Sequence, residues 1–270
     1  MTTPTWNPTQ YLRHADHRAR PFGDLLARVP DPPTARPRIA DLGCGPGNVT
    51  VRLTERWPAA HVTGYDNSPE MLAKAEDRAG ATPAGGSLDF AHADVRTWRP
   101  EEPYDLIVSN ATLQWVPGHA DLFAAWIDGL APGGTLAFQV PGNFASPSHR
   151  LMRELADSPR WRDRLADALR HDGAILTPEA YLERLTALGC TGVDVWETTY
   201  VHLLTGADPV LDWVKGTGLL PVLTALADDP QARDAFVAQY RAALREAYPP
   251  GPHGTPFPFR RVFAVARKES

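Results

Sequence analysis

The stretch RIADLGCGPGN, Arg38 to Asn48, places three glycines within five residues directly after a short apolar run. Arg38 to Leu42 has the composition of a buried strand, and Val49 to Trp57 has helical composition that ends at Pro58. Glycines at such a point let the backbone turn sharply and approach a ligand closely. The stretch therefore predicts a strand, a ligand-binding loop and a helix.

Four more apolar runs follow the loop and are separated by segments of helical composition. The predicted strands lie at His61 to Tyr65, Leu88 to Ala93, Leu106 to Ser109 and Leu136 to Val140. The segments between them comprise predicted helices at Glu70 to Ala79 and Ala120 to Leu130, and a turn at Ala131 to Gly134. Strands that alternate with helices are typical of an α/β protein, so we predict a doubly wound, mostly parallel sheet.

The pattern changes after Pro141, because helical segments then follow one another with few strands between them. The predicted helices are Ser148 to Asp157, Trp161 to Leu169, Pro178 to Leu188, Asp208 to Lys215 and Gln231 to Ala247. Strand character returns only near 193–204 and 261–267. We expect these two strands to complete the sheet.

This pattern predicts one structural domain in three parts. An N-terminal lid segment (1–37) precedes a ligand-binding core (38–140), and the remainder (141–270) completes the sheet. Helices of the remainder, at about 141–175 and 205–250, are expected to form a cap over the carboxyl ends of the strands, where open α/β sheets bind ligands. The cap is therefore predicted to select the substrate.

The composition excludes several classes of protein. The 270 residues carry a formal net charge of −5, which gives no large basic surface and argues against a nucleic-acid partner. We find no leader with an apolar core and no run of about 18 uncharged apolar residues, so we expect no membrane association and a cytoplasmic location. Only Cys44 and Cys190 occur, without the spacing of a disulfide framework or a metal site, so we expect no metal.

The spacing of the glycines distinguishes between two kinds of nucleotide ligand. A dinucleotide-binding loop follows the pattern GxGxxG, and the helix after it receives a pyrophosphate. Gly43, Gly45 and Gly47 instead follow GxGxG, and Asn48 stands where the third glycine of the dinucleotide pattern would be. The spacing favours a nucleoside-type cofactor without a pyrophosphate over a merely tight turn.

Polar residues close the strands that follow the loop. Asp66, nineteen residues after Gly47, is placed to accept hydrogen bonds from both ribose hydroxyls of either NAD or S-adenosylmethionine. Asp94 is placed to bind the exocyclic amine of adenine, with the Val95 amide beside a ring nitrogen, and a helix or turn cap is the alternative. Asn110 is expected to face the amino-acid end of the cofactor unless it only forms a turn.

Together with an APGG turn before the fifth strand, these residues resemble the class I S-adenosylmethionine-dependent methyltransferases over about residues 38 to 140. The resemblance implies a Rossmann-like methyltransferase sheet that binds S-adenosylmethionine. The cofactor-binding residues that it implies are Asp41, Gly43, Gly45, Gly47, Asn48, Asp66, Asn67, Met71, Asp94, Val95 and Asn110.

Motifs outside this core are similar to those of the trans-aconitate 2-methyltransferases and extend nearly from end to end. They are WNP at 6–8, RARP at 18–21, NATLQW at 110–115, WVKGTGL at 213–219, YPP at 248–250 and PFRRVF at 258–263. The resemblance implies a carboxyl O-methyltransferase. Its reaction transfers a methyl group from S-adenosylmethionine to one carboxylate of trans-aconitate and gives a monomethyl ester and S-adenosylhomocysteine.

Such a reaction needs no general base, because a carboxylate is already ionised at neutral pH and can attack a sulfonium methyl group directly. Catalysis then depends on positioning and on the exclusion of water. The positioning candidates are Gln114, Trp115 and Tyr11. Trp115 is expected to set an aromatic face beside the sulfonium unless it packs in the core, and Tyr11 belongs to the predicted lid.

A small polycarboxylate substrate requires cationic partners, because burying several negative charges without them is prohibitively costly. Arginine suits this task, since its planar guanidinium binds a carboxylate through two hydrogen bonds. Each substrate-binding candidate also fits an ordinary surface or core residue. The candidates are Arg18, Arg20, His149, Tyr200, Lys215, Tyr248, Arg260 and Arg261.

Three other interpretations stay open. The nearest is a class I methyltransferase that acts on another small acid or secondary metabolite. An NAD-binding oxidoreductase is less favoured, because Asn48 breaks the dinucleotide pattern and no hydride-transfer dyad is evident. A regulator that binds S-adenosylmethionine without turnover would not need the cationic residues.

Overall fold

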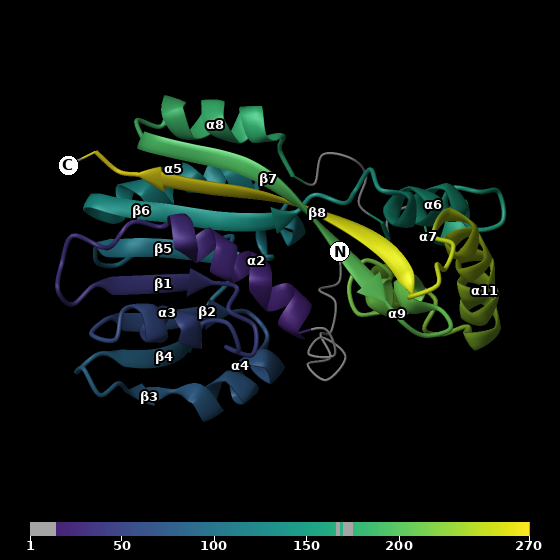
Figure 1. Ribbon diagram of the computed structural model, residues 1–270, viewed down its shortest axis with the longest axis horizontal. Helices are drawn as coiled ribbons and strands as arrows, with labels where there is room; N and C mark the ends of the chain where they lie inside the picture. Colours follow the sequence, from purple (N-terminus) through teal and green to yellow (C-terminus); the bar gives the residue numbers. More distant parts are fainter. Residues whose placement is uncertain (1–14, 166–167, 170–174, 270) are drawn as a thin grey trace. The chain divides into compact units, whose positions relative to one another are not determined.

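The computed structural model describes residues 15–165, 168–169 and 175–269, with side chains from Ala19 onward. The strands are β1 (Arg38–Leu42), β2 (His61–Asp66), β3 (Gly80–Ala81), β4 (Ser87–His92), β5 (Tyr104–Asn110), β6 (Leu130–Pro141), β7 (Thr191–Leu204) and β8 (Thr255–Arg267). They form one sheet in the order β3-β4-β2-β1-β5-β6-β8-β7 (Figure 1). The strands β4, β2, β1, β5 and β6 run parallel, whereas β3 is antiparallel to β4 and β8 to β6.

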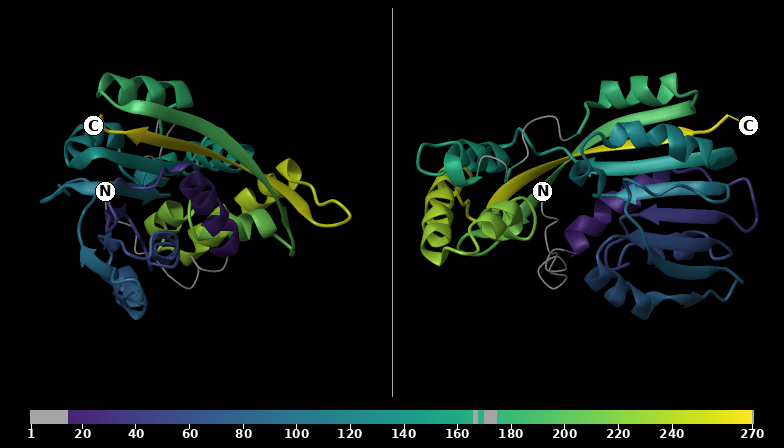
Figure 2. Two further views of the ribbon diagram at one scale, coloured as in Figure 1. Left: turned by 60° about the vertical axis from the view of Figure 1, so that its left-hand side comes forward. Right: turned by 180° about the vertical axis from the view of Figure 1, so that it is seen from behind.

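Ten α-helices accompany the sheet in the described part of the chain. They are α2 (Ala15–Arg28), α3 (Val51–Arg56), α4 (Pro69–Ala75), α5 (Phe123–Asp128), α6 (Pro147–Ala156), α7 (Arg162–Leu165), α8 (Pro178–Ala187), α9 (Pro209–Lys215), α10 (Leu220–Ala225) and α11 (Pro230–Ala247). Short 3-10 helices are η1 (Glu76–Arg78), η2 (Leu113–Trp115) and η3 (His119–Leu122). Figures 1 and 2 show α2 and α5 on opposite faces of the sheet, which confirms the predicted doubly wound α/β class.

Five of the 27 prolines are the first residues of helices. The helices α4, α6, α8, α9 and α11 each start with a proline, whose missing N–H is not needed in a first turn and whose φ is already helical. Ser68, Thr177 and Asp229 cap α4, α8 and α11 by accepting hydrogen bonds from backbone amides in the first turn. Local sequence therefore defines these five helix starts.

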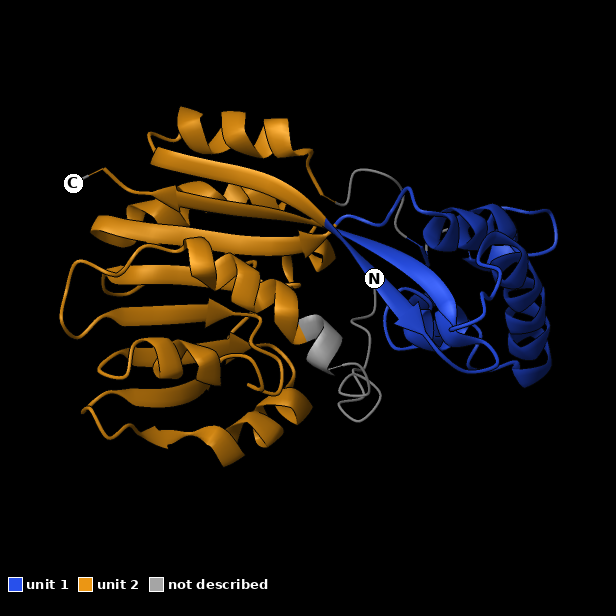
Figure 3. Ribbon diagram, viewed as in Figure 1, with its two compact units in different colours: residues 1–15, 142–174, 199–260 blue, residues 16–141, 175–198, 261–270 orange. Residues whose placement is uncertain are grey.

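The chain divides into two compact units by its internal contacts (Figure 3), and the predicted single domain with its lid, core and cap stays a prediction. Unit 2 comprises Asp16–Pro141, Ile175–Thr198 and Arg261–Ser270. Unit 1 comprises Met1–Ala15, Gly142–Ala174 and Thr199–Arg260. Most of the predicted cap falls in unit 1, and the predicted ligand-binding core falls in unit 2.

Each unit has its own apolar core. In unit 2, Trp126 of α5 and Tyr181 of α8 pack with Ile107 and Phe138 of the sheet. In unit 1, the core includes Trp213, Phe236, Tyr240 and Phe257, all almost completely buried. Burial of aromatic side chains of this size stabilises each unit by several kcal/mol, about 1.5–3 kcal/mol for each large apolar side chain. No described helix is long and apolar enough to cross a membrane.

The structure differs from the predicted elements in several places, three of which concern the N-terminal segment and the sheet. Residues 15–28 of the predicted lid form α2, which buries Phe22 and Leu25 in unit 2. The predicted turn at 131–134 lies within β6, where the register with β5 shifts between Tyr104 and Leu106. The strand predicted at 261–267 begins already at Thr255.

Candidate active site

The carboxyl ends of the parallel strands bring most predicted cofactor residues to one edge of the sheet. The strand β2 ends at Asp66 and β5 at Asn110, while Gly43 follows β1 and Asp94 follows β4 closely. These four strands are consecutive neighbours in the sheet. Residues far apart in the sequence therefore form one row at the edge where open α/β sheets bind ligands.

The glycine-rich loop has no space for a side chain at Gly43 but open space beside Gly45. Gly43 has a φ of +79°, and a Cβ at this position would lie 2.2 Å from Thr112 Oγ1, so only glycine fits. The Gly43 amide donates to the Tyr65 carbonyl oxygen at 2.7 Å, and Thr112 Oγ1 donates to the Gly43 carbonyl oxygen at 3.1 Å. A Cβ on Gly45 would instead meet no atom within 4 Å. The loop thus leaves open space beside the Gly45 backbone.

The loop continues into a close contact with the sheet. Gly47 has a φ of +69°, and a Cβ there would lie 2.6 Å from Phe90 Cζ. Asn48, which follows it, is half-buried. Met71 is a buried residue of α4, whereas Asn67 is exposed, so the Asn67 side chain is the more accessible of the two. Their roles stay predictions.

Both carboxylate oxygens of Asp66 accept hydrogen bonds from backbone amides. Its Oδ2 accepts from the Gly45 amide at 2.8 Å, and its Oδ1 accepts from the Ser68 amide at 2.9 Å. Burial raises the pKa of Asp66, and these backbone hydrogen bonds oppose the rise. An ionised carboxylate has about four lone-pair sites, so Asp66 keeps acceptor capacity for a donor on a ligand.

Asp41 is a buried carboxylate with one unused oxygen. Its side chain is 1% exposed, and its Oδ2 accepts from Thr50 Oγ1 at 2.7 Å. Its Oδ1 has no hydrogen-bond partner within the described residues. Burial raises the pKa of Asp41 to about 7, and the negative charge of Asp66 contributes to the rise. A donor or cation brought to Asp41 would therefore be bound favourably.

Asp94 has a local partner that the sequence did not suggest. Its Oδ1 accepts from the Arg96 amide and from Arg96 Nε, each at 2.9 Å, and the guanidinium also pairs with Oδ2. This hydrogen bonding lowers the pKa of Asp94. Val95 is buried. The turn-cap alternative is thus present, and a role in binding adenine stays a prediction.

Asn110 is linked to two buried residues on neighbouring strands. Gln139 Nε2 donates to Asn110 Oδ1, and Arg261 Nη1 donates to Gln139 Oε1 at 3.1 Å. Ala111, directly after Asn110, has a φ of +56°, a conformation that costs a residue other than glycine roughly 1–2 kcal/mol. Its amide donates to the Gln139 carbonyl oxygen at 2.9 Å, which helps to hold this turn.

Two of the positioning candidates, Gln114 and Trp115, lie close to this turn. Gln114 is buried in η2, and its Nε2 donates to the Ala111 carbonyl oxygen at 2.6 Å, so it supports the strained turn. Trp115 follows it and is half-buried. Tyr11 lies outside the described residues. Direct contact of these residues with the reacting groups stays a prediction.

His149 of unit 1 is a neutral side chain at physiological pH. Burial and the nearby positive charge of Arg153 lower the pKa of His149 to about 4. Its Nδ1 lies 3.2 Å from Ser148 Oγ, and its ring contacts that of Phe144. His149 can therefore offer a ligand a hydrogen bond but no positive charge.

Tyr248 supports the start of α6. Its hydroxyl accepts from the Ser148 amide at 3.0 Å, while the Tyr240 hydroxyl donates to the Ser148 carbonyl oxygen at 2.6 Å. Tyr200, also predicted to bind substrate, is buried and stacks on His202. The structure thus gives Tyr248 a structural function within unit 1.

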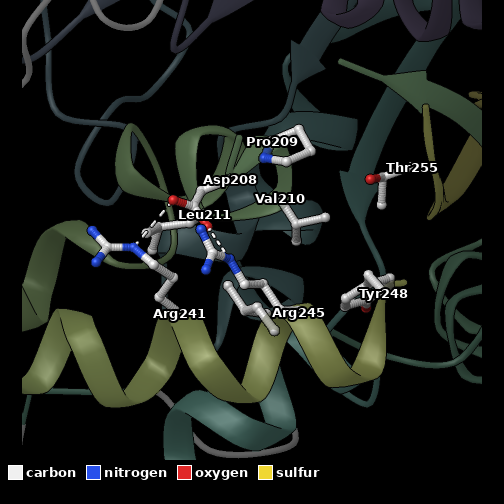
Figure 4. Close-up of a pocket in the computed structure, with 9 residues that line it drawn as sticks. Asp208, Pro209, Val210, Leu211, Arg241, Arg245, Tyr248 and Thr255 are labelled. Atoms are coloured by element: carbon white, nitrogen blue, oxygen red, sulfur yellow. Dashed lines mark hydrogen bonds and ion pairs between the residues drawn. The ribbon is translucent and has the colours of Figure 1, made fainter. Parts of the chain in front are cut away.

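A small cavity in unit 1 lies beside Tyr248 (Figure 4). Its volume is about 20 Å³, which holds about one water molecule and no tricarboxylate. Arg241 and Arg245 both approach its wall but pair with Asp208, with Nε to oxygen distances of 3.2 and 2.7 Å. Both guanidinium groups are therefore already paired with a carboxylate.

The predicted cations are distributed over both units. Arg20 of unit 2 pairs with Asp24 at 3.9 Å, and the Arg18 side chain lies outside the described part. In unit 1, Lys215 pairs with Asp212 at 3.7 Å, and Arg260 Nη1 donates to the Gly142 carbonyl oxygen at 3.3 Å. Each unit holds some of the candidates, and their substrate contacts stay predictions.

Several residues of the site escaped the sequence analysis. They are Thr50, Ser68, Arg96, Thr112 and Gln139. Two of them carried a usable signal. Ser68 stands before Pro69 at a helix start, which is typical of an N-cap, and Gln139 interrupts the apolar run Leu136 to Val140. The described residues contain no group of three or more His, Cys, Asp or Glu side chains that could hold a metal ion.

Comparisons with known proteins agree with this geometry. Residues 39–134 match a family described as a methyltransferase domain. Phosphoethanolamine N-methyltransferase 2 of Haemonchus contortus, solved with S-adenosyl-L-methionine, has a similar fold, with a TM-score of 0.55 at 18% identity. The similarity covers 93% of this chain and 53% of that one, so the chain spans about half the length of this neighbour. Fold and site thus define a class I methyltransferase.

Relatives along the whole chain define the family. A protein of Streptomyces coelicolor named trans-aconitate 2-methyltransferase is 75% identical over 99% of this chain and 88% of its own length. One of the same name from Streptomyces avermitilis is 74% identical over 99% of this chain and 98% of its own. The chain belongs to the trans-aconitate 2-methyltransferase family, as its motifs predicted.

Proposed function

We propose that this chain transfers a methyl group from S-adenosylmethionine to one carboxylate of trans-aconitate in the cytoplasm. The products are a monomethyl ester and S-adenosylhomocysteine. The observation that carries the proposal is the 75% identity, over 99% of the chain, to a relative named for this activity. The partner is accordingly a small polycarboxylic acid.

Features of the site fit a nucleoside cofactor with a charged amino-acid end. The space beside Gly45 is open, and Asp66 keeps lone pairs for hydroxyl donors. The buried Asp41 Oδ1 lacks a partner among the described residues and suits a donor or cation. When bound, S-adenosylmethionine supplies an electrophilic methyl group on a sulfonium.

The residues of the chain bind, orient and desolvate the acid. No residue has to remove a proton from it, because a carboxylic acid with a pKa near 4 is ionised at neutral pH. Its negative charges require cations, and Arg20, Lys215, Arg260 and Arg261 are the candidates in the described part. His149 is neutral and can only donate or accept a hydrogen bond.

A mass-spectrometric screen tests the proposal. The protein is incubated with S-adenosylmethionine and separately with trans-aconitate, cis-aconitate, isocitrate and citrate. We expect a gain of one methyl ester on trans-aconitate and little on the other acids. Binding of S-adenosylhomocysteine without methylation of any acid would overturn the proposed substrate. Binding of NADH, measured by calorimetry, would favour the oxidoreductase alternative instead.

A further inference from the structure

Three side chains from neighbouring strands form a directed chain of hydrogen bonds in unit 2. Arg261 of β8 donates from Nη1 to Gln139 Oε1 at 3.1 Å, and Gln139 of β6 donates from Nε2 to Asn110 Oδ1 of β5. Asn110 and Gln139 are directly paired in the parallel register of β5 and β6. Gln139 is 0% exposed, Arg261 is 4% exposed, and Asn110 is half-buried.

The direction of these hydrogen bonds is fixed by the guanidinium group of Arg261. A guanidinium only donates hydrogen bonds, so Gln139 must turn its carbonyl oxygen toward Arg261. The Gln139 amide nitrogen then faces Asn110, which must present its own carbonyl oxygen. The Nδ2 group of Asn110 is left without a partner among the described residues. Arg261 therefore determines which end of the Asn110 amide is available to a ligand.

The backbone holds the same residues in place. The Ala111 amide donates to the Gln139 carbonyl oxygen at 2.9 Å, so Gln139 holds both the side chain of Asn110 and the turn after it. Ala111 keeps a φ of +56°, which persists in a residue other than glycine only where its surroundings enforce it. Asn110 thus has little freedom to reorient.

We propose that Gln139 and Arg261 are positioning residues that orient Asn110 so that its Nδ2 donates to a carboxylate. The donor stands at the carboxyl edge of the sheet, where the ligands of the proposed function bind, and the inference rests on that function. Both ligands carry carboxylates, one on the amino-acid end of the cofactor and the others on the acceptor acid. An N–H group binds a carboxylate strongly, whereas a reversed amide would turn its oxygen toward a negative charge.

The variant Gln139→Glu tests the proposal by reversing the orientation of the Asn110 amide. The new carboxylate accepts from Arg261 but cannot donate to Asn110, so the Asn110 amide turns its Nδ2 inward and its oxygen toward the ligand. Pairing with Arg261 favours retention of the fold, which the unfolding midpoint checks. The matched control is Gln239→Glu, the same change at an exposed residue of α11 in unit 1, which we expect to alter no binding constant.

Two measurements, the affinity for cofactor analogues and the KM for the acid, show whether the carboxylate belongs to the cofactor or to the acceptor acid. If it belongs to the cofactor, Gln139→Glu weakens S-adenosylhomocysteine at least tenfold and leaves 5′-methylthioadenosine, which lacks the amino-acid end, unchanged. If it belongs to the acceptor acid, the KM for the acid rises at least tenfold while S-adenosylhomocysteine binds as before. The proposal is overturned if S-adenosylhomocysteine and the acid both bind as they do to the wild type. It is also overturned if S-adenosylhomocysteine and 5′-methylthioadenosine are weakened equally.

Two further variants separate orientation from a merely structural role. Asn110→Asp still accepts from Gln139 but has no donor, so it should weaken the same ligand as Gln139→Glu does. An Asn110→Asp variant that weakens neither ligand would contradict the proposal. Arg261→Lys still donates to Gln139, so it should weaken the ligand less than Gln139→Glu does. If the wild type methylates none of the four acids, the proposed function fails, and the comparison of S-adenosylhomocysteine with 5′-methylthioadenosine alone decides the positioning role.

Discussion

Asp66 Oδ2 accepts a hydrogen bond from the Gly45 amide at 2.8 Å, so the carboxylate that ends β2 is bound to the loop that follows β1. The same carboxylate accepts from the Ser68 amide before α4. One side chain therefore connects the loop, a strand and a helix start, while it keeps lone pairs for a ligand. We therefore expect changes at this single carboxylate to affect both the shape of the loop and cofactor affinity.

Asp66→Ala should weaken the binding of S-adenosylhomocysteine by roughly 2–4 kcal/mol, because the charge-assisted hydrogen bonds to the ribose are lost and the Gly45 amide loses its partner. Asp66→Asn keeps one acceptor oxygen and should lose less. Isothermal titration calorimetry measures both, and equal affinities of wild type and Asp66→Ala would refute the assignment.

Cofactor binding should release protons at pH 6.5. The pKa of Asp41 is raised to about 7, so much of this carboxyl group is protonated in the free protein, and a cationic group bound nearby lowers its pKa. Calorimetry in two buffers of different ionisation enthalpy measures the release, which should vanish at pH 8.5. Asp41→Asn should abolish it, and proton uptake by the wild type would contradict the prediction.

Gly43→Ala and Gly45→Ala should affect different properties. A Cβ on Gly43 would lie 2.2 Å from Thr112 Oγ1, so this variant should lower the Tm by several degrees. A Cβ on Gly45 enters open space, so its variant should lose only the roughly 1–2 kcal/mol of a left-handed conformation in stability but lose cofactor affinity more strongly. Thermal unfolding and calorimetry on both variants check this contrast.

His119 should make the protein less stable in acid. Its Nε2 lies 2.7 Å from the Tyr181 hydroxyl, and burial lowers its pKa below the usual 6.5. A depressed folded-state pKa means that this stability is present above pH 6.5 and is lost as the pH falls toward the lower value. Urea unfolding at pH 7.5 and pH 5 should show a larger loss for the wild type than for His119→Gln. A loss of the same size in both proteins would assign the acid sensitivity to other groups.

The sequence allowed the central strands to be predicted, because their apolar runs end at glycine or acidic residues. It also allowed Gly43, Gly45, Gly47 and Asp66 to be placed together, since consecutive parallel strands end at one edge. The helix α2 was missed because Pro21 lies inside it, and proline normally interrupts a helix.

Other features depend on tertiary structure. The early part of β8 was missed because Pro256 and Pro258 argue against a strand, although both occupy exposed alternate positions between buried residues. The links from Arg261 through Gln139 to Asn110 depend on the register of β6 with β5 and β8, and apolar periodicity does not specify that register.

The position of β8 between β6 and β7 has a consequence for synthesis. Among the strands in the described part of the chain, β8 is synthesised last, yet β7 has β8 as its one neighbour in the sheet. A nascent chain that has reached Leu204 therefore carries β7 without a partner, and one edge of β6 is also unpaired. Such edges favour aggregation. The sheet is therefore complete only after β8 has been synthesised. Between the synthesis of β7 and that of β8, a chaperone would protect the chain most.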